Sequence, residues 1–432
     1  MITRVTVREY ARLTTEPIQT SLDCAQVSVS AFDWLCELSA SFRKSGATLL
    51  MVDGKRSLKL DNYVGVIETP CGTQLEILPK DTDHLDGLED SRALLRRMIQ
   101  AALKLPAREV GPANLQLFNA PLSEWVMREF LQHLDYLIKR GLRFDYQRIE
   151  EEQHFLRGQL NVTAQMRQPP GRQHRFQIRH DVFLPNCAEN RLLKLALERV
   201  CKSTQEPGNW RLAHELRGLL TEVPASVDKR EDFNSWRNDR LMAHYQPIKP
   251  WCELVLGEQS PLSVSGDWRG ISLLFPMEKL FERYVEVLLR SQLIGAAQLL
   301  PQRSSHSLCT HDNKPMFELR PDFLLKHGQR KWVMDAKWKR IDTSDRSRKY
   351  GLSQADFYQL FAYGQTYLKA EEEGEMVLIY PHTERFPSPL DKPFIFSEKL
   401  KLWVLPFDLK RGVLLGGELA SLPLIEQCEG AV

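Results

Sequence analysis

A carboxylate inside an apolar strand constrains the fold of this chain more than any other sequence feature. Asp335 lies in the stretch 331–338, which is otherwise rich in tryptophan, valine and methionine and is typical of a buried β-strand. An unpaired carboxylate is costly to bury in such surroundings. Alternate residues of a strand share one face, so Lys337 points the same way as Asp335. The fold must therefore gather polar partners or a ligand at this face.

A second acid precedes this strand. Asp322 lies in the strand-like stretch 316–325, and the turn at 326–330 leads from there to the next strand. If the two strands pair, Asp322 reaches the same position as Asp335 and Lys337. Two carboxylates beside a lysine suit Mg²⁺ and phosphate, because hard carboxylate oxygens hold this cation while it keeps several waters. The cation polarises a scissile phosphate and activates a water, and the lysine offsets negative charge.

The same residues have a purely structural interpretation. Asp322 can cap a turn, and Asp335 and Lys337 can form a cross-strand charge pair. A helix predicted after the basic loop favours the chemical interpretation, because its Gln359 and Tyr363 lie four residues apart and face one site. From residue 277 onward the elements follow in the order helix, strand, strand, helix, strand, strand.

These motifs resemble those of a known nuclease group. Pro321-Asp322 followed by Asp335-Ala336-Lys337 resembles the signature of the PD-(D/E)xK nuclease superfamily, and the QxxxY helix is typical of its members in DNA-processing machines. With the upstream Arg157-Gly-Gln-Leu160 and Glu189-Asn-Arg-Leu-Leu-Lys194, the chain resembles the McrC family, the nuclease subunits of modification-dependent restriction systems. The resemblance covers roughly residues 75–430 and is strongest over 275–385.

The resemblance implies an endodeoxyribonuclease, a phosphodiester hydrolase that uses Mg²⁺, with Mn²⁺ as a substitute. Asp322 and Asp335 correspond to metal ligands and Lys337 to the catalytic lysine. Gln359 and Tyr363 correspond to residues that support the site or hold the DNA backbone.

The superfamily also implies a third carboxylate. Many members take it from the first helix, which here begins at Met277. Glu278 and Glu282 are the candidates, one helical turn apart, and Glu282 is the favoured catalytic residue and metal ligand. Its structural alternative is a solvated helix glutamate. Arg157 and Asn190 are predicted to be structural rather than catalytic.

A partner is implied as well. McrC-like proteins dock on a McrB-like AAA+ GTPase hexamer, stimulate its GTP hydrolysis and cut double-stranded, methylated foreign DNA. This chain contains neither GxxxxGK[ST] nor GxGxxG, so the partner is expected to hydrolyse the nucleotide. Two alternatives stay open, a catalytically silent docking subunit and a free-standing DNA repair nuclease. The intact acids and lysine disfavour the first, and the long region ahead of residue 260 disfavours the second.

The sequence predicts a cytoplasmic protein without a membrane segment. Residues 1–13 lack the apolar run of a secretory signal, and no stretch approaches the ~20 apolar residues of a membrane span. The eight cysteines are scattered without a CxxC pair, which is typical of reduced thiols. His306, Cys309 and His311 form a metal-like cluster, but zinc sites normally draw on a second ligand pair, so no metal is expected there.

The chain is predicted to be an α/β (α+β) multidomain protein. Residues 1–90 are predicted to form a β-rich domain that docks the partner, and residues 91–260 a mostly helical middle domain. Residues 261–432 are expected to form the nuclease domain, whose core by resemblance is a mixed central sheet flanked by helices.

The net charge conceals local fields. The chain has 58 basic and 56 acidic residues, and a charge of +2 argues against a dedicated nucleic-acid binder. However, residues 154–180 contain five arginines and no acid, and residues 326–350 contain nine Lys or Arg against three Asp. Fields of this kind can hold a phosphate backbone, so the neutral average does not exclude a DNA enzyme.

Overall fold

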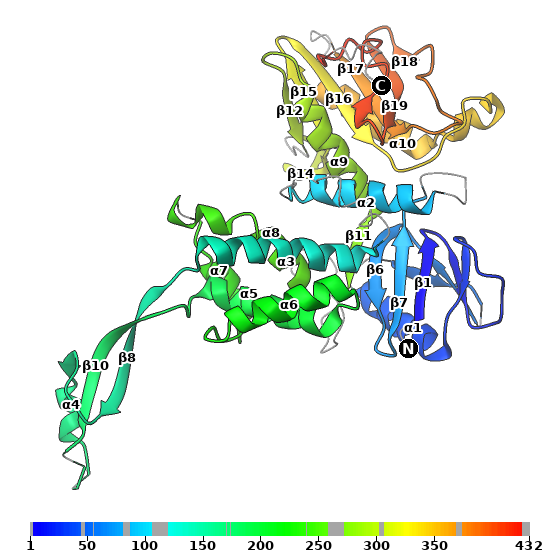
Figure 1. The fold of residues 1–432 in the computed structure, drawn as a ribbon. Coiled ribbons are helices and arrows are strands. Elements are labelled where there is room, and N and C mark those ends of the chain that lie inside the picture. The colour runs from blue at the N-terminus through cyan, green and yellow to red at the C-terminus, as the bar shows by residue number, and fades with distance from the viewer. Residues whose placement is uncertain are drawn as a thin grey trace. The chain divides into compact units, whose positions relative to one another are not determined.

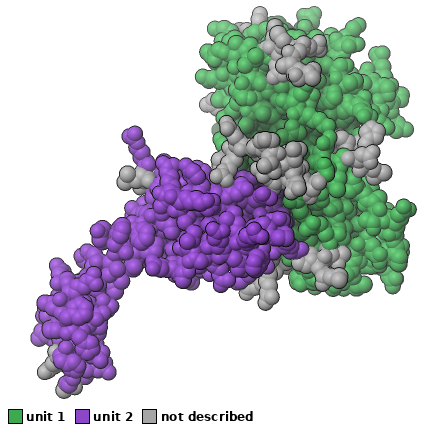
Figure 2. All heavy atoms as spheres, viewed as in Figure 1, with its two compact units in different colours: residues 1–122, 274–432 green, residues 123–273 purple. Residues whose placement is uncertain are grey.

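The computed structural model places most of the chain in two compact units. The described residues are 3–44, 48–54, 56–80, 87–105, 120–169, 171–172, 174–238, 240–257, 272–301, 306–368 and 374–425. The first unit combines residues 1–122 with 274–432, and the second is made of residues 123–273 (Figure 2). The second unit is therefore a continuous insertion in the sequence of the first.

The first unit begins with two small sheets. One has the strand order β1-β7-β6-β11 (Figure 1), and the other has the order β3-β2-β5-β4. Alternating valines of the first strand are buried, which is the pattern that predicts a strand with one face in a core. The helix that follows packs against β4. The elements are β1 (Thr3–Arg8), β2 (Arg12–Thr14), β3 (Cys24–Gln26), α1 (Val29–Lys44), β4 (Leu50–Val52), β5 (Ser57–Leu60), β6 (Tyr63–Glu68) and β7 (Thr73–Leu78).

Two elements tie this region to the C-terminal part of the same unit. β11 (Leu273–Pro276) completes the first sheet beside β6, and the amide of Met277 donates to the carbonyl of Asn62 at 3.0 Å. α2 (Leu88–Ala102) packs against β7 and against α9 (Met277–Ser291). The compact units therefore do not divide at the boundary expected at 90, because the apolar face of α2 is buried in the first unit. The boundary expected at 260 lies outside the described residues.

The C-terminal part of the first unit has the expected mixed sheet. Its strand order is β12-β15-β16-β17-β19-β18, with β16, β17 and β19 parallel and the other neighbours antiparallel. The predicted fold class is confirmed. The elements are β12 (Gln298–Pro301), β13 (His306–His311), β14 (Lys314–Leu319), β15 (Phe323–His327), β16 (Arg330–Ala336), η3 (Arg346–Gly351), α10 (Gln354–Tyr367), β17 (Gly374–Pro381), β18 (Phe394–Ser397), β19 (Leu400–Asp408) and β20 (Val413–Leu414).

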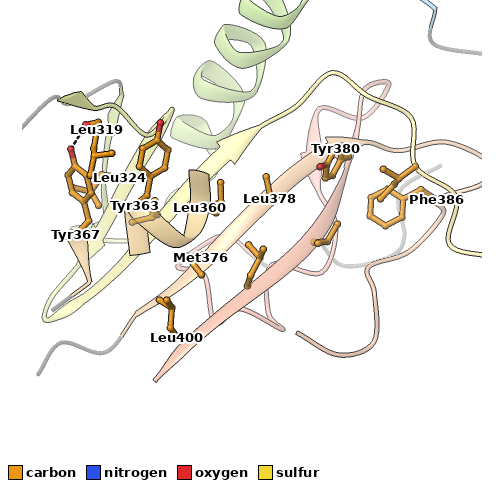
Figure 3. Packing of buried hydrophobic residues seen from close by; sticks show 14 residues of the cluster. Leu319, Leu324, Leu360, Tyr363, Tyr367, Met376, Leu378, Tyr380, Phe386 and Leu400 are labelled. Carbon is orange, nitrogen blue, oxygen red and sulfur yellow. Dashed lines mark hydrogen bonds between the residues drawn. The ribbon is translucent and has the colours of Figure 1, made fainter. Parts of the chain in front are cut away.

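One apolar cluster holds α10 against this sheet. Leu360 of the helix is buried with Met376 and Leu378 of β17 (Figure 3). The helix approaches closely because residue 364 is glycine. A Cβ on Gly364 would lie 2.5 Å from the sulfur of Met376 and 2.7 Å from Cδ1 of Leu400.

The second unit is mostly helical, as predicted for the middle of the chain. Its helices carry apolar residues at helical spacing, and the leucines of α5 at 192, 193 and 197 are fully buried. The elements are α3 (Leu122–Arg140), α5 (Ala188–Ser203), α6 (Pro207–Leu219), α7 (Lys229–Ser235), η2 (Arg240–Tyr245) and α8 (Lys249–Leu256).

A long arm extends from this helical body. It consists of β8 (Asp145–Gln153), β9 (Gln159–Leu160), α4 (Val162–Met166) and β10 (Phe176–Leu184), with β10 antiparallel to both other strands (Figure 1). The positive charge expected over residues 154–180 is partly neutralised in the arm. Arg175 and Arg179 pair with Glu152 and Glu150 of β8 at 2.9 and 2.5 Å, so acids on the neighbouring strand offset part of that charge.

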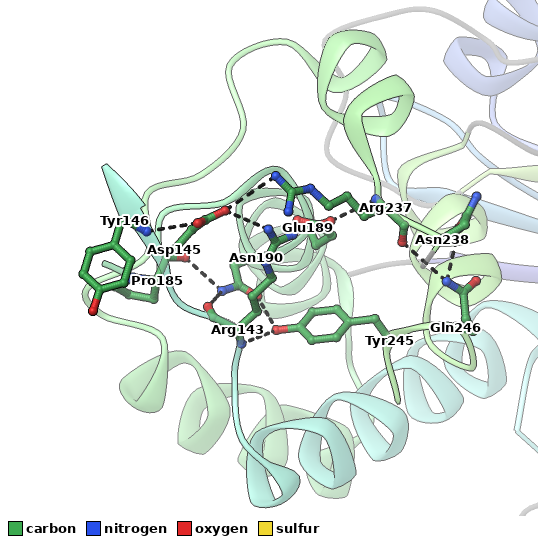
Figure 4. A network of polar contacts seen from close by, with 10 residues as sticks. All are labelled: Arg143, Asp145, Tyr146, Pro185, Glu189, Asn190, Arg237, Asn238, Tyr245 and Gln246. Carbon is green, nitrogen blue, oxygen red and sulfur yellow. Dashed lines mark hydrogen bonds and ion pairs between the residues drawn. The ribbon is translucent and has the colours of Figure 1, made fainter. Parts of the chain in front are cut away.

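A buried polar network fastens the base of the arm. The hydroxyl of Tyr245 accepts from the amide of Arg143 at 2.8 Å and donates to Oδ1 of Asn190 at 2.7 Å (Figure 4). Nδ2 of Asn190 donates to the carbonyls of Arg143 and Pro185, both at 2.9 Å. Asn190 thus bonds to both chain segments that enter the arm, a structural position like the one predicted for it.

Candidate active site

Asp335 is the most deeply buried acid of the candidate site. It is the sixth residue of β16, 0% exposed, and its neighbours in the strand are apolar. Nζ of Lys337 lies 2.6 Å from its Oδ2. Burial raises the pKa of Asp335, and the nearby ammonium offsets part of this effect. Burial alone would lower the pKa of Lys337, but the carboxylate of Asp335 raises it, so the lysine stays charged.

Asp322 converges on the same point. It precedes β15, and its Oδ2 accepts from the amide of Ala336 at 2.8 Å, which joins it to the end of β16. Burial, the charge of Asp335 and the charge of Glu282 raise the pKa of Asp322 to about 8. Two buried carboxylates that repel each other share a proton when no cation is present.

These two acids fit a divalent cation. Both side-chain oxygens of Asp335 are buried, and the ammonium of Lys337 lies 2.6 Å from Oδ2. The donor set is made of hard oxygens, which suits Mg²⁺. No complete cluster of three acidic, histidine or cysteine side chains is found in the described part of the chain. Water and phosphate oxygens would therefore have to complete the coordination, as is usual for this cation.

The structure distinguishes the two helix glutamates. Glu282 of α9 is partly buried, and its charge contributes to the raised pKa of Asp322. Glu278, one turn earlier, is exposed, and its charge acts on Tyr10 instead. The fold thus brings Glu282 towards the paired acids and leaves Glu278 away from them. The role of Glu282 as a metal ligand stays a prediction.

The QxxxY helix positions the chain just ahead of the Pro-Asp pair. Nε2 of Gln359 donates to the hydroxyl of Tyr363 at 2.8 Å, and that hydroxyl donates to the carbonyl of Arg320 at 3.0 Å. One turn later, the hydroxyl of Tyr367 donates to the carbonyl of Leu319 at 2.7 Å (Figure 3). Two consecutive carbonyls are held in this way, so the helix supports the position of the first acid.

A supporting ion pair lies beside the site and was not predicted. Nζ of Lys339 lies 2.9 Å from Oδ2 of Asp356, which also accepts from the hydroxyl of Tyr380 at 3.3 Å. Asp356 is buried, and its charge helps to raise the pKa values of Asp335 and Lys337. The sequence signal for this pair was the DxKxK spacing. It places Lys339 two residues after Lys337, on the same side if the chain continues extended.

The His-Cys cluster lies on a separate hairpin. His306, Cys309 and His311 are exposed on β13, and the ring of His306 packs edge-on against Tyr367 with centroids 4.7 Å apart.

Comparisons with known proteins give a family and a fold. A family model described as "McrBC 5-methylcytosine restriction system component" matches residues 58–381. No protein with a curated description matches the chain. In the part of the chain that the structure describes, no helix is long and apolar enough to cross a membrane.

Two solved structures from Thermococcus gammatolerans are similar in fold. One is a half-complex from a tetradecameric assembly of McrB AAA+ hexamers with bound McrC. It matches with a TM-score of 0.72 and 20% identity over 97% of this chain and 98% of that chain. The other is a cryo-EM structure of the McrBC complex, with a TM-score of 0.52 and 22% identity over 67% of this chain and 87% of that chain.

Proposed function

The chain belongs to the McrBC family of restriction-system components, and from this premise we propose that it is the Mg²⁺-dependent endonuclease subunit of a McrBC-like complex. The observation that carries the proposal is the convergence of Asp322, Asp335 and Lys337 at one end of a mixed sheet. Two buried acids with raised pKa values beside a charged lysine destabilise a fold that has no ligand for them. A bound cation would compensate the charge of the two acids.

The site residues divide the work of phosphodiester hydrolysis. Asp322 and Asp335 would hold the cation, which supplies positive charge to the scissile phosphate and acidifies a bound water. Lys337 keeps its proton and donates to oxygens on which negative charge develops. Tyr363 orients the first acid through the preceding backbone, and Lys339 with Asp356 braces the lysine strand.

The proposed partner is a McrB-like AAA+ GTPase hexamer. The similar half-complex from Thermococcus gammatolerans contains McrB AAA+ hexamers, and this sequence has no P-loop of its own. Large apolar side chains are exposed along the arm, which marks it as an interaction surface. They are Tyr146, Phe155, Leu156, Leu160, Val162, Met166 and Phe183. The docking role expected for residues 1–90 stays a prediction beside this one.

Double-stranded, methylated DNA is the proposed substrate. Basic residues that follow the lysine strand, such as Arg346, Arg348 and Lys349, are exposed and lie on the same polypeptide segment as the site. Exposed cations of this kind bind a phosphate backbone without regard to sequence. Recognition of the modified base is therefore assigned to the partner.

A single substitution tests this proposal. In a plasmid assay with the partner GTPase, GTP and Mg²⁺, Asp335→Asn is expected to reduce cleavage by about 10²–10³-fold, because it removes a charge that holds the cation. Stimulation of GTP hydrolysis by the same variant is expected to stay nearly unchanged. Glu278→Gln, an exposed acid of α9, is the matched control and is expected to cleave normally. Undiminished cleavage by the Asp335 variant would contradict the site. Cleavage by the wild-type chain without partner or GTP would favour a free-standing nuclease. No cleavage by the wild-type chain under any condition would favour a catalytically silent subunit.

A further inference from the structure

A cavity of about 270 Å³ lies where two pairs of parallel strands end within the first unit. Its walls come from the residues that follow β1 and β7 and from those that follow β16 and β17. Both pairs run parallel. Ligands of α/β sheets bind beyond the carboxyl ends of parallel strands, where chain segments diverge and leave a crevice. Its volume is slightly below the ~300–1,000 Å³ of pockets for drug-sized ligands, so it admits one small molecule.

Cations dominate the charged lining of this cavity. Lys80, Lys339 and Arg340 line it, against the single carboxylate of Glu9. Side chains of Lys80 and Lys339 are 38% and 42% exposed although each has an acidic partner. An ammonium has three donors, so one partner does not exhaust it. The lining therefore suits an anion with several acceptor oxygens, such as a phosphate.

The carboxylate in the cavity is already engaged. Oε1 of Glu9 accepts from Nε1 of Trp338 at 2.7 Å and from the amide of Lys80 at 2.8 Å. Through these bonds, Glu9 connects Trp338, which follows β16 of the mixed sheet, with Lys80, which follows β7 of the N-terminal sheet. The two donors offset part of the negative charge that Glu9 presents to an incoming anion.

Two aromatic side chains border the cavity, one exposed and one that is only 7% exposed. Trp338 and Tyr10 both line the cavity, and Tyr10 is 41% exposed. Tyr10 has a φ of 63°, a left-handed conformation that bulky residues rarely adopt. Strain of this kind is retained where a side chain must be presented to a ligand. Flat walls beside cations suit a planar heterocycle carrying a phosphate.

A buried hydroxyl lacks a partner at the same place. Thr383 lines the cavity, is 8% exposed, and its Oγ1 has no hydrogen-bond partner among the described residues. Buried polar side-chain atoms nearly always have a partner, and an exception calls for an explanation. A polar ligand atom in the cavity would supply the missing bond.

We propose that this cavity binds a nucleotide, with its phosphate at Lys80, Lys339 and Arg340 and its base against Tyr10 and Trp338. The nucleotide is either free in solution or a unit of the DNA strand, since both present the same chemistry. Only the second source rests on the proposed nuclease function. The site has no glycine-rich phosphate loop, and neither Asp322 nor Asp335 is among its lining residues.

Binding of two probes by the full-length chain tests the proposal. Equilibrium dialysis measures radiolabelled GMP, and fluorescence anisotropy measures a labelled DNA duplex in EDTA, which prevents cleavage. Arg340→Ala is expected to weaken binding about tenfold through loss of a charged hydrogen bond, and Thr383→Val about threefold through loss of a neutral one. Arg346→Ala removes a cation from the same basic segment but not from the cavity lining, and is the control.

The outcomes separate the two sources. Tight GMP binding that both cavity variants weaken, and Arg346→Ala does not, identifies a free nucleotide. Absence of GMP binding together with weaker duplex binding by Thr383→Val identifies a nucleotide of the DNA. If Thr383→Val melts below wild type, Lys80→Gln replaces it. Unchanged affinity of the cavity variants for both probes would overturn the proposal. Since neither assay requires cleavage, an inactive catalytic site would leave these results intact.

Discussion

Binding of Mg²⁺ is expected to release a proton from the paired acids. Asp322 has a pKa raised to about 8 by burial and by the neighbouring carboxylates. At pH 7 a group with this pKa is about 90% protonated, and at pH 9 about 10%. A cation binds the deprotonated form, so saturating Mg²⁺ should release about 0.9 proton per chain at pH 7 and about 0.1 at pH 9. The apparent affinity should accordingly rise with pH until about pH 8 and then level off.

A pH-stat measures this release directly. Concentrated, unbuffered protein is titrated with Mg²⁺, and the base needed to hold the pH is recorded. Asp322→Asn keeps the shape of the side chain and an acceptor for the amide of Ala336 but has no proton of its own to release, so its signal at pH 7 should fall well below that of wild type. The charge of Glu278 acts on Tyr10 and not on the paired acids, so Glu278→Gln should release protons as wild type does. Equal release at pH 7 and pH 9, or full release by Asp322→Asn, would refute the reasoning.

Three further substitutions probe the surroundings of the site. Glu282→Gln should reduce cleavage about tenfold at limiting Mg²⁺ and less at saturating Mg²⁺, whereas Glu278→Gln should not; equal effects would remove Glu282 from the site. Tyr363→Phe should lower the free energy of unfolding by about 1 kcal/mol, measured by urea unfolding, and should reduce plasmid nicking about tenfold. Tyr367→Phe should lower the free energy of unfolding by a similar amount without the same loss of nicking. Gly364→Ala should lower the free energy of unfolding by about 1–3 kcal/mol, because its Cβ would meet Met376 and Leu400; an unchanged urea midpoint would contradict this packing.

The centre of the candidate site was predictable because its chemistry is local. Asp335 and Lys337 share a strand face by the alternation of side chains, and the turn after Asp322 returns the chain antiparallel. Asp356 was not found, since its approach to Lys339 depends on how α10 docks on the sheet. Nothing in a single sequence specifies that packing.

The two long strands of the arm, β8 and β10, escaped prediction for a different reason. The stretch 145–153 is charged or polar at most positions, so it has no apolar alternation that would reveal a strand. It is stabilised instead by cross-strand pairs such as Arg148 with Asp181 at 3.3 Å, whose members lie more than thirty residues apart. The sequence also did not reveal that the first unit is built from two separate stretches of the chain. The strand β11 follows the whole insertion in sequence, yet it pairs with β6 of the N-terminal sheet.

The continuity of β11 with α9 has a consequence for how such proteins can diversify. The helix that carries Glu282 starts at the residue after a strand of the N-terminal sheet, so this sheet is joined without a loop to the part of the chain that holds the candidate site. The helical unit and its arm are encoded as a single uninterrupted cassette between Leu122 and Leu274. Exchange of this segment for another would leave every strand of the C-terminal mixed sheet uncut. The arm can therefore be replaced as one segment while Asp322, Asp335 and Lys337 stay unchanged in the sequence.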